Sequence, residues 1–417
     1  MNSLEEGERV ELTVGAPAHG GHCVARVGGE HGQVVFVRHA LPGERVTAEI
    51  TELHKGFLRA DAVEIHEASA DRVEPPCPYA RPGACGGCDL QHASGEAQRR
   101  WKASVVEEQL RRLAKLRREV HVEELPGGLL GWRSRVRYAV DAAGRAGLLK
   151  HRSHEVVAID RCRIAHPAIQ KLDLLRREWP EADALEAVAT TGGDVTVLAR
   201  PTGTGSLLPP DDPAEGTTLG GGGRQLVEGP AEVTERAAGR TWRVPPEGFW
   251  QVHPAAAETL VAAVVEMLRP AGGESMWDLY GGAGLFAAAV AGHTHGRTTV
   301  VESSSAGVAS ARTNLADLPH AEVVQARVDS ALLRRRVTGP VDLVVLDPPR
   351  AGAGAKVVRA VVAAAPRAVA YVACDPASLA RDINTFQELG WRLTALRAFD
   401  LFPMTQHVEC VALLSRG

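Results

Sequence analysis

The stretch Ser275-Met276-Trp277-Asp278-Leu279-Tyr280-Gly281-Gly282-Ala283-Gly284 predicts a buried strand, a glycine-rich turn and the start of a helix. Around it, from about Trp242 onwards, helical and strand patterns alternate, which is typical of a parallel sheet covered by helices. Further strands are expected at residues 298–302, 323–326, 341–347, 368–373 and 409–414, and a helix at 254–268. The sequence therefore predicts a C-terminal α/β domain over residues 241–417.

The glycine-rich turn predicts a nucleotide-like ligand at the carboxyl ends of the strands, where glycines let the backbone approach closely. Glu302 ends the next predicted strand and could accept both ribose hydroxyl hydrogens. A dinucleotide is the alternative, but the G-x-G-x-x-G spacing is missing. Asp278 precedes the turn and would repel a pyrophosphate, whereas it suits a cationic cofactor such as S-adenosylmethionine. The pattern favours a methyl donor over NAD.

A lone cysteine stands in the stretch Ala370-Tyr371-Val372-Ala373-Cys374-Asp375-Pro376-Ala377-Ser378. Asp followed by Pro is typical of a helix start, so Cys374 should lie between a strand end and a helix N-terminus. That position lowers a thiol pKa and would favour a nucleophilic thiolate. The alternative is a small buried side chain without reactivity. Upstream, Asp347-Pro348-Pro349-Arg350 predicts a stiff loop, and its arginine replaces the aromatic residue usual in amino-methyltransferases.

Residues 1–66 predict a small β-barrel of the oligonucleotide-binding type, because short strand patterns alternate with glycine-rich turns. The turn Pro42-Gly43-Glu44 resembles the corresponding turn of TRAM domains, which are RNA-binding barrels. A purely structural barrel remains the alternative.

Residues 67–240 are expected to form a central α+β domain that carries a cysteine cluster. Cys77, Cys85 and Cys88 fall within twelve residues, and Cys162 is the best candidate for a fourth ligand. Zinc and an iron–sulfur cluster both accept four thiolates, and the absence of a second Cys-x-x-Cys pair favours the cluster. Cys23 and Cys410 are isolated and are expected to be structural.

The formal net charge of −4 does not by itself indicate nucleic-acid binding, but basic residues concentrate locally. One basic run lies in a helix expected at 94–118, with Ser94 as N-cap. In the second, Arg133, Arg135 and Arg137 alternate along a predicted strand and could line one sheet face toward phosphates. The proline- and glycine-rich span from Gly192 to Gly223 predicts strands interrupted by a flexible loop.

No signal peptide and no apolar run of membrane-spanning length is visible, so a cytoplasmic protein is expected. A monomer without membrane contact is also expected.

Taken together, the chain resembles the bacterial RNA uridine-5-methyltransferases of the TrmA/RumA type, which make 5-methyluridine in tRNA or 23S rRNA. The resemblance covers nearly the whole chain and rests on the TRAM-like turn, the cysteine cluster and five short segments: Phe249–Gln251, Asp278–Gly284, Asp347–Arg350, Cys374–Pro376 and His407–Glu409. It implies a Rossmann-like class I methyltransferase domain at the C-terminus. One departure is the seven-residue spacing between Cys77 and Cys85, which is longer than in many family members.

The resemblance also implies roles for individual residues. Cys374 would be the nucleophile that adds to uracil, and Glu409 the base that removes the proton from carbon 5. The S-adenosylmethionine site would comprise Gln251, Tyr280, Glu302, Asp329 and Asp347. A [4Fe-4S] cluster, with zinc as the lesser alternative, would be held by Cys77, Cys85, Cys88 and Cys162.

Three other functions compete with this hypothesis. An RNA cytosine-5-methyltransferase would use similar covalent chemistry, but commonly has two active-site cysteines. A non-catalytic iron–sulfur RNA-binding protein would need neither Cys374 nor Glu409. An NAD-dependent oxidoreductase would need a different glycine spacing.

Overall fold

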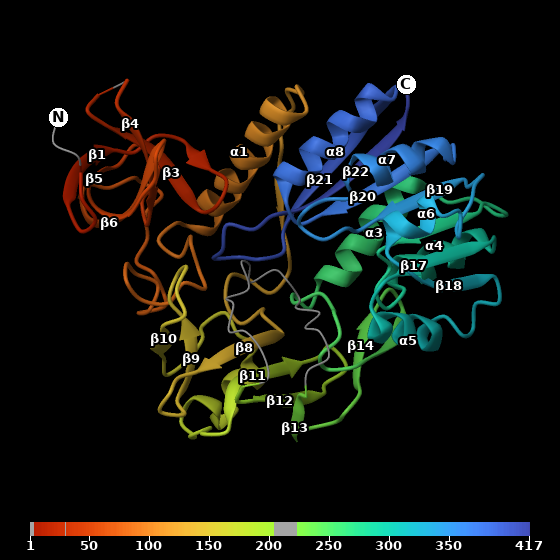
Figure 1. Cartoon of the computed structure of the whole chain (residues 1–417), viewed down its shortest axis with the longest axis horizontal. Helices are drawn as coiled ribbons and strands as arrows, with labels where there is room; N and C mark the ends of the chain where they lie inside the picture. Colours follow the sequence, from red (N-terminus) through yellow and green to blue (C-terminus); the bar gives the residue numbers. More distant parts are fainter. Residues whose placement is uncertain (1–3, 30, 204–222) are drawn as a thin grey trace.

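The computed structural model describes residues 4–29, 31–203 and 223–417 (Figure 1). Most of the loop predicted between Gly192 and Gly223 lies outside these residues. A strand at its beginning, β12 (Val195–Pro201), is described and agrees with the prediction.

The N-terminal segment forms a curved sheet in which strands follow the spatial order β1-β5-β6-β4-β3-β2. Its strands are β1 (Arg9–Thr13), β2 (Pro17–Ala18), β3 (His22–Val27), β4 (Gln33–Arg38), β5 (Arg45–Leu53) and β6 (Phe57–Glu67). The paired strands do not close into a complete barrel. However, the chain after β1 reaches β3, since Gly15 N–H donates to the Val24 carbonyl at 2.7 Å and Val24 N–H to the Ala16 carbonyl at 2.9 Å. The sheet thus curls around an apolar core, as expected for the predicted module.

The central segment forms an antiparallel sheet in the order β10-β9-β8-β11-β12-β13, followed by the hairpin β14-β15. Besides β12, its elements are β8 (Arg135–Val140), β9 (Ala146–Leu149), β10 (Val156–Ala158), α2 (Pro167–Gln170), the 3-10 turn η1 (Asp173–Leu175), β11 (Ala182–Ala189), β13 (Gln225–Glu228), β14 (Val233–Ala237) and β15 (Arg240–Val244). This sheet packs into the same hydrophobic core as the C-terminal segment, through side chains that include Tyr138, Leu185 and Val197.

The C-terminal segment contains the predicted α/β sheet, in the order β18-β17-β16-β19-β20-β22-β21-β7 (Figure 1). Strands β16 to β20 are parallel, and β22 runs antiparallel to both β20 and β21. The elements are α3 (Ala256–Leu268), β16 (Met276–Leu279), α4 (Leu285–Thr294), β17 (Thr298–Glu302), α5 (Ser305–Asn314), β18 (Ala321–Gln325), α6 (Val328–Leu333), β19 (Leu343–Leu346), α7 (Gly354–Ala363), β20 (Ala368–Ala373), α8 (Pro376–Glu388), β21 (Trp391–Asp400) and β22 (Glu409–Arg416).

Helices cover both faces of this sheet because its central strands are apolar on both sides. On β20, Ala368, Ala370 and Val372 pack into the core shared with α3 and α4. The alternate residues Val369 and Tyr371 pack into the core shared with α7 and α8. This double burial leaves the strand ends as the places where polar side chains can gather.

Helix α1 (Gly95–Leu113) joins the N-terminal sheet to the C-terminal sheet, and Figure 1 shows it between them. Ser94 caps it, as predicted, by accepting the Ala97 N–H at 3.3 Å, but the helix ends before residue 118. Trp101 packs into the core of the N-terminal sheet, whereas Leu110 packs into the core beside α8. The following strand, β7 (Val122–Glu124), pairs with β21 at the edge of the large sheet. The N-terminal and C-terminal segments are therefore held in one fixed relation.

Candidate active site

The carboxyl ends of the parallel strands bring the predicted donor-site residues into one row. Leu279 is paired with Val301 on one side and with Leu346 on the other. Because parallel strands end at the same sheet edge, the next residues along each strand (Tyr280, Glu302 and Asp347) lie side by side. The sheet thus assembles three of the predicted residues at its β17-β16-β19 edge.

The glycine-rich turn is closely packed against this edge. A Cβ atom on Gly281 would lie 2.5 Å from Val300 Cγ1, so only glycine fits there. The Gly282 N–H donates to Glu302 Oε2 at 3.0 Å, and the Ser304 N–H donates to Glu302 Oε1 at 2.6 Å. Backbone donors therefore fix the Glu302 carboxylate beside the turn.

Two further carboxyl groups gather behind the turn. Burial, with a smaller contribution from the neighbouring Glu302, raises the pKa of Asp278 to about 7. Burial also raises the pKa of Asp347 to about 7, with Asp278 and Glu302 adding to the effect. Asp278 Oδ2 accepts the Ala287 N–H at 2.8 Å, while Oδ1 has no hydrogen-bond partner among the described protein atoms. A bound cation would reduce the electrostatic repulsion between these carboxylates.

The remaining donor-site candidates lie on loops and helix starts. Asp329 lies in the first turn of α6, where its carboxylate pairs with Arg327 at 3.3 Å. Its charge raises the pKa of Tyr280, after the larger effect of burial, which places the two side chains near each other. Gln251 is half-buried in the segment between β15 and α3. Its proposed contact with a donor stays a prediction.

Cys374 and Glu409 are brought together by the register of β20 and β22. Ala373 is paired with Cys410 across these antiparallel strands. Cys374, which follows Ala373, and Glu409, which precedes Cys410, therefore lie next to each other at the end of the sheet. Both lie beyond Asp347, which electrostatically affects each of them. The nucleophile and base candidates therefore share one end of the sheet with the acidic donor edge.

The structure corrects the expected acidity of the Cys374 thiol. Its pKa is raised, because burial disfavours the thiolate and the carboxylates of Glu409, Asp347 and Asp375 repel it; Arg350 opposes this shift. The pKa of Glu409 is also raised, by burial and by Asp347. The raised pKa values favour the protonated form of both groups in the free protein, despite the nearby start of α8.

Arg350 brings a positive charge into this acidic end of the sheet. Its guanidinium lies 3.2 Å from His407 Nδ1 and lowers the pKa values of both Cys374 and Glu409. Cys410, by contrast, packs into the core beside α8, on the opposite face of β22 from Glu409. It is therefore poorly placed as a second active-site cysteine.

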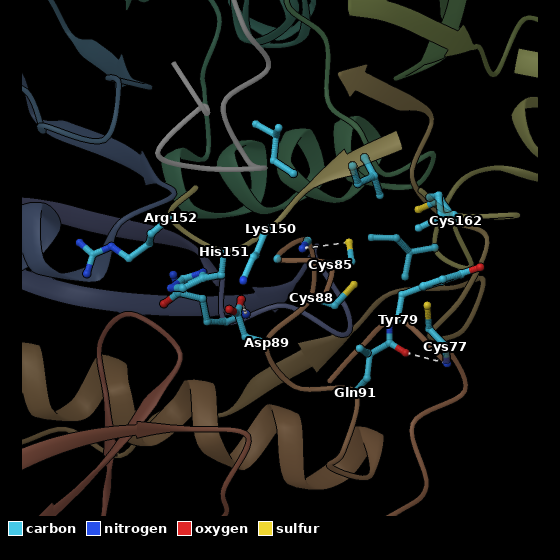
Figure 2. A pocket seen from close by; sticks show the side chains of 18 of the residues that line it. Cys77, Tyr79, Cys85, Cys88, Asp89, Gln91, Lys150, His151, Arg152 and Cys162 are labelled. Atoms are coloured by element: carbon cyan, nitrogen blue, oxygen red, sulfur yellow. Dashed lines mark hydrogen bonds between the residues drawn. The ribbon is translucent and has the colours of Figure 1, made fainter. Parts of the chain in front are cut away.

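The four cysteines of the predicted cluster all line one cavity of about 630 Å³ between the N-terminal sheet, the cysteine segment and the central sheet. Figure 2 shows Cys77, Cys85, Cys88 and Cys162 around Tyr79 in this cavity. Burial raises the pKa of Cys85 to about 12, and the neighbouring Cys162 and Cys77 add to the shift. In the part of the chain that the structure describes, no group of three or more His, Cys, Asp or Glu side chains is placed to hold a single metal ion.

Two of the three alternating arginines, Arg133 shortly before β8 and Arg135 at its start, do not lie in the predicted open row. Arg135 donates to the backbone carbonyls of Pro246 and Gly248 at 2.8 and 2.9 Å, and lies 3.6 Å from Glu235. Arg133 is buried beside the cysteines, whose charges raise its pKa against the larger lowering effect of burial. Arg135 thus supports the chain leading to Gln251 instead of facing a phosphate backbone.

Sequence reasoning missed one contact at this site, between the N-terminal sheet and the nucleophile loop. His19 Nε2 lies 2.8 Å from Asp375 Oδ2, although the two residues are 356 positions apart. No local pattern marks such a pair, because His19 stands in an ordinary glycine turn.

Comparisons with known proteins identify the family. A TRAM domain model matches residues 3–63, and a tRNA (uracil-5-)-methyltransferase model matches residues 224–417. An uncharacterized RNA methyltransferase of Streptomyces avermitilis is 50% identical over 98% of this chain and 98% of its own. The chain belongs to the RNA uracil-5-methyltransferase family. It is therefore an S-adenosylmethionine-dependent RNA methyltransferase, as the sequence predicted.

Other relatives of this RNA uracil-5-methyltransferase cover the whole chain as well. An uncharacterized RNA methyltransferase of Bifidobacterium longum is 36% identical over 98% of this chain and 97% of its own. A crystal structure of Pyrococcus abyssi tRNA (uracil-54, C5)-methyltransferase with S-adenosyl-L-homocysteine has a TM-score of 0.72 at 22% identity, covering 97% of this chain and 100% of that one. This likeness confirms the fold.

None of the helices in the described ranges is long and apolar enough to cross a membrane.

Proposed function

We propose that this enzyme methylates carbon 5 of a uridine in a structured tRNA or 23S rRNA through a covalent bond between Cys374 and the uracil. The observation that carries the proposal is the β20–β22 register, which places Cys374 and Glu409 together beside Asp347 at the donor edge. A thiol and a carboxylate are the two groups that this reaction requires.

The covalent step answers a chemical problem, since carbon 5 of uracil is a poor nucleophile. The Cys374 thiolate forms a bond to carbon 6, and the electrons of the C5=C6 double bond move toward O4 as an enolate. Carbon 5 then takes the methyl group, which S-adenosylmethionine supplies from its sulfonium. Loss of the carbon 5 proton and cleavage of the S–C6 bond restore the double bond and the thiolate.

Glu409 would accept the carbon 5 proton. Its raised pKa makes its carboxylate a stronger base than an exposed glutamate. Arg350 lowers the pKa of both Cys374 and Glu409, and so supports the charged forms that the reaction needs. Because burial raises both pKa values, positive charge near Cys374 and Glu409, such as the sulfonium of the methyl donor, would favour their charged forms.

The acidic edge suits S-adenosylmethionine. Glu302 would accept the ribose hydroxyls, since its carboxylate is held beside the turn by two N–H donors. Burial, and to a smaller extent neighbouring carboxylates, raise the pKa values of Asp278 and Asp347 to about 7, and a sulfonium would stabilise both groups in their charged forms. Tyr280, Asp329 and Gln251 would complete the donor site.

In this proposal a [4Fe-4S] cluster would be held by Cys77, Cys85, Cys88 and Cys162, which line one cavity. Thiolates on one zinc ion lie about 3.8 Å apart, given a Zn–S bond of about 2.3 Å. The described residues contain no such close group, yet these four thiols line one cavity. A cluster binds each thiolate through a different iron, so it would need the four thiols around one shared space. Arg133, buried beside the thiols, would offset their negative charge, and the cluster would supply a structural clasp.

The RNA partner is supported by the charge of the same cavity. Its lining includes Arg59, Arg137, Lys150, Arg152, Arg161 and Arg163. Among the described lining residues Asp89 is the one carboxylate, so basic side chains outnumber acidic ones in a way that suits phosphates. Since His407 also lines the cavity, this surface leads to the Cys374 end of the sheet, into which a target uridine would be flipped.

The test is transfer of a labelled methyl group to RNA, followed by digestion and identification of the nucleoside. Total tRNA and rRNA from a strain without 5-methyluridine should yield labelled 5-methyluridine. Cys374→Ala should abolish transfer and leave donor binding intact, whereas Cys23→Ala, which removes a buried thiol of the N-terminal sheet, should stay active. Labelled 5-methylcytidine, or no product with any RNA, would contradict the proposal.

A further inference from the structure

The turn between β2 and β3 reaches from the N-terminal sheet into the active-site region. His19 begins this turn, and Gly20 and Gly21 follow with φ values of 102° and 77°. A Cβ atom on Gly21 would lie 3.0 Å from the side chain of Asp89, so the turn packs tightly against the cysteine segment. The glycines thereby aim His19 at the loop that follows β20.

His19 contacts the residue next to the proposed nucleophile. Its Nε2 lies 2.8 Å from Asp375 Oδ2, while Asp375 Oδ1 accepts the Ser378 N–H at 2.7 Å and caps α8. Both carboxylate oxygens are thus used, which fixes the Asp375 side chain between two elements. Burial alone would raise the pKa of Asp375, but the hydrogen bonds from His19 and Ser378 hold it at about 2.

The same region of the N-terminal sheet also supports the strand that carries Glu409. Arg38, at the end of β4, lies 3.6 Å from Asp89. Asp89 in turn accepts the Gln406 N–H at 3.2 Å, three residues before Glu409. The N-terminal sheet therefore braces the chain segments on both sides of the proposed reaction centre.

We infer that His19 is a positioning residue of the methyl-transfer reaction: by holding Asp375 it fixes the loop that presents Cys374 to the uracil. The inference rests on the proposed function. The N-terminal sheet then contributes to the covalent step itself, beyond holding RNA. The physical reason is that the contact fixes the Asp375 side chain, and with it the loop next to Cys374.

The test measures how fast the enzyme forms a covalent adduct with RNA that contains 5-fluorouridine, in which fluorine blocks loss of the carbon 5 substituent. His19→Ala should slow adduct formation about tenfold, as expected for a lost hydrogen bond to a charged group. RNA affinity should stay within about twofold, which separates positioning from RNA binding. His19→Gln should restore most of the rate, because a glutamine amide can donate from nearly the same place as Nε2.

His66→Ala is the matched control, since His66 is an exposed histidine of the same sheet that bonds to Thr47 Oγ1 at 2.7 Å. His19 is 42% exposed, so its removal opens no core cavity, and unfolding temperatures should confirm intact folding. Combining His19→Ala with Asp375→Asn should give less than the sum of the two effects. An unchanged adduct rate in His19→Ala, or a loss that glutamine does not restore, would overturn the inference. Absence of any adduct with the unaltered enzyme would instead overturn the proposed function.

Discussion

Ala373 and Cys410 are directly paired across the antiparallel strands β20 and β22. This one pairing places Cys374 and Glu409 at a common sheet edge, although 34 residues of helix, strand and loop lie between them. The same edge continues through Asp347 to the glycine-rich turn after Asp278. The proposed nucleophile, base and donor site thus lie at the ends of neighbouring strands of one sheet.

Glu409→Gln should trap the reaction after methyl transfer. The amide cannot take the carbon 5 proton, so the S–C6 bond cannot break by elimination. We expect a stable protein–RNA adduct that survives denaturing electrophoresis and contains the transferred methyl group. Rapid release of methylated RNA by this variant would show that another group is the base.

Binding of S-adenosylmethionine should strengthen as pH rises from 6 to 8. Asp278 and Asp347 have pKa values of about 7, so below that pH they are mostly neutral and attract the sulfonium less. Each group can change affinity by up to about tenfold over this interval. Calorimetry at several pH values checks the effect, with Asp347→Asn expected to reduce it. S-adenosylhomocysteine, which lacks the positive charge, should show a weaker dependence; equal dependence for both ligands would contradict the account.

The buried Lys102–Asp400 pair should be essential for stability. Lys102 Nζ lies 2.5 Å from Asp400 Oδ1 and 3.0 Å from the Phe402 carbonyl, and both side chains are almost fully buried. Lys102→Met leaves an unpaired buried carboxylate and should cost about 3 kcal/mol, seen as a lower unfolding temperature. The double variant with Asp400→Leu should recover much of the loss. An unchanged unfolding temperature in the single variant would refute this reasoning.

The purified enzyme should carry about four irons per chain and a brown chromophore. Cys85→Ser should lose iron, whereas Cys23→Ala should retain it, because Cys23 is buried in the N-terminal sheet and does not line the cavity. Metal analysis and the absorption spectrum measure this without reference to activity. One zinc per chain and no iron would exclude the proposed cluster.

The sequence predicted the parallel strands and their order along the chain well, because strongly apolar runs that end near Leu279, Glu302, Asp347 and Cys374 identify buried strands. It did not predict β7. This strand has only three residues, Val122–Glu124, which give no periodic signal, and it pairs with β21, which is distant in the sequence. The boundaries predicted at residues 66 and 240 stay a prediction, as do the individual site roles, a cytoplasmic location and a monomeric state.

Other differences arise from tertiary context. The position of Cys374 beside a helix start was correct, but the direction of its pKa shift was wrong, because Glu409 and Asp347 arrive from other strands. The arginines at 133 and 135 were expected to face RNA, yet nearby backbone carbonyls and thiols surround them. Long-range pairs such as His19 and Asp375 leave no trace in local sequence.

The central claim is covalent catalysis by Cys374, and the most direct measurement is mass spectrometry of the enzyme after reaction with 5-fluorouridine RNA and S-adenosylmethionine. The account predicts a protein species heavier by one nucleotide fragment plus a methyl group, after nuclease digestion, with the added mass mapped to Cys374. Added mass on another residue, or methylated product without any adduct, would contradict it.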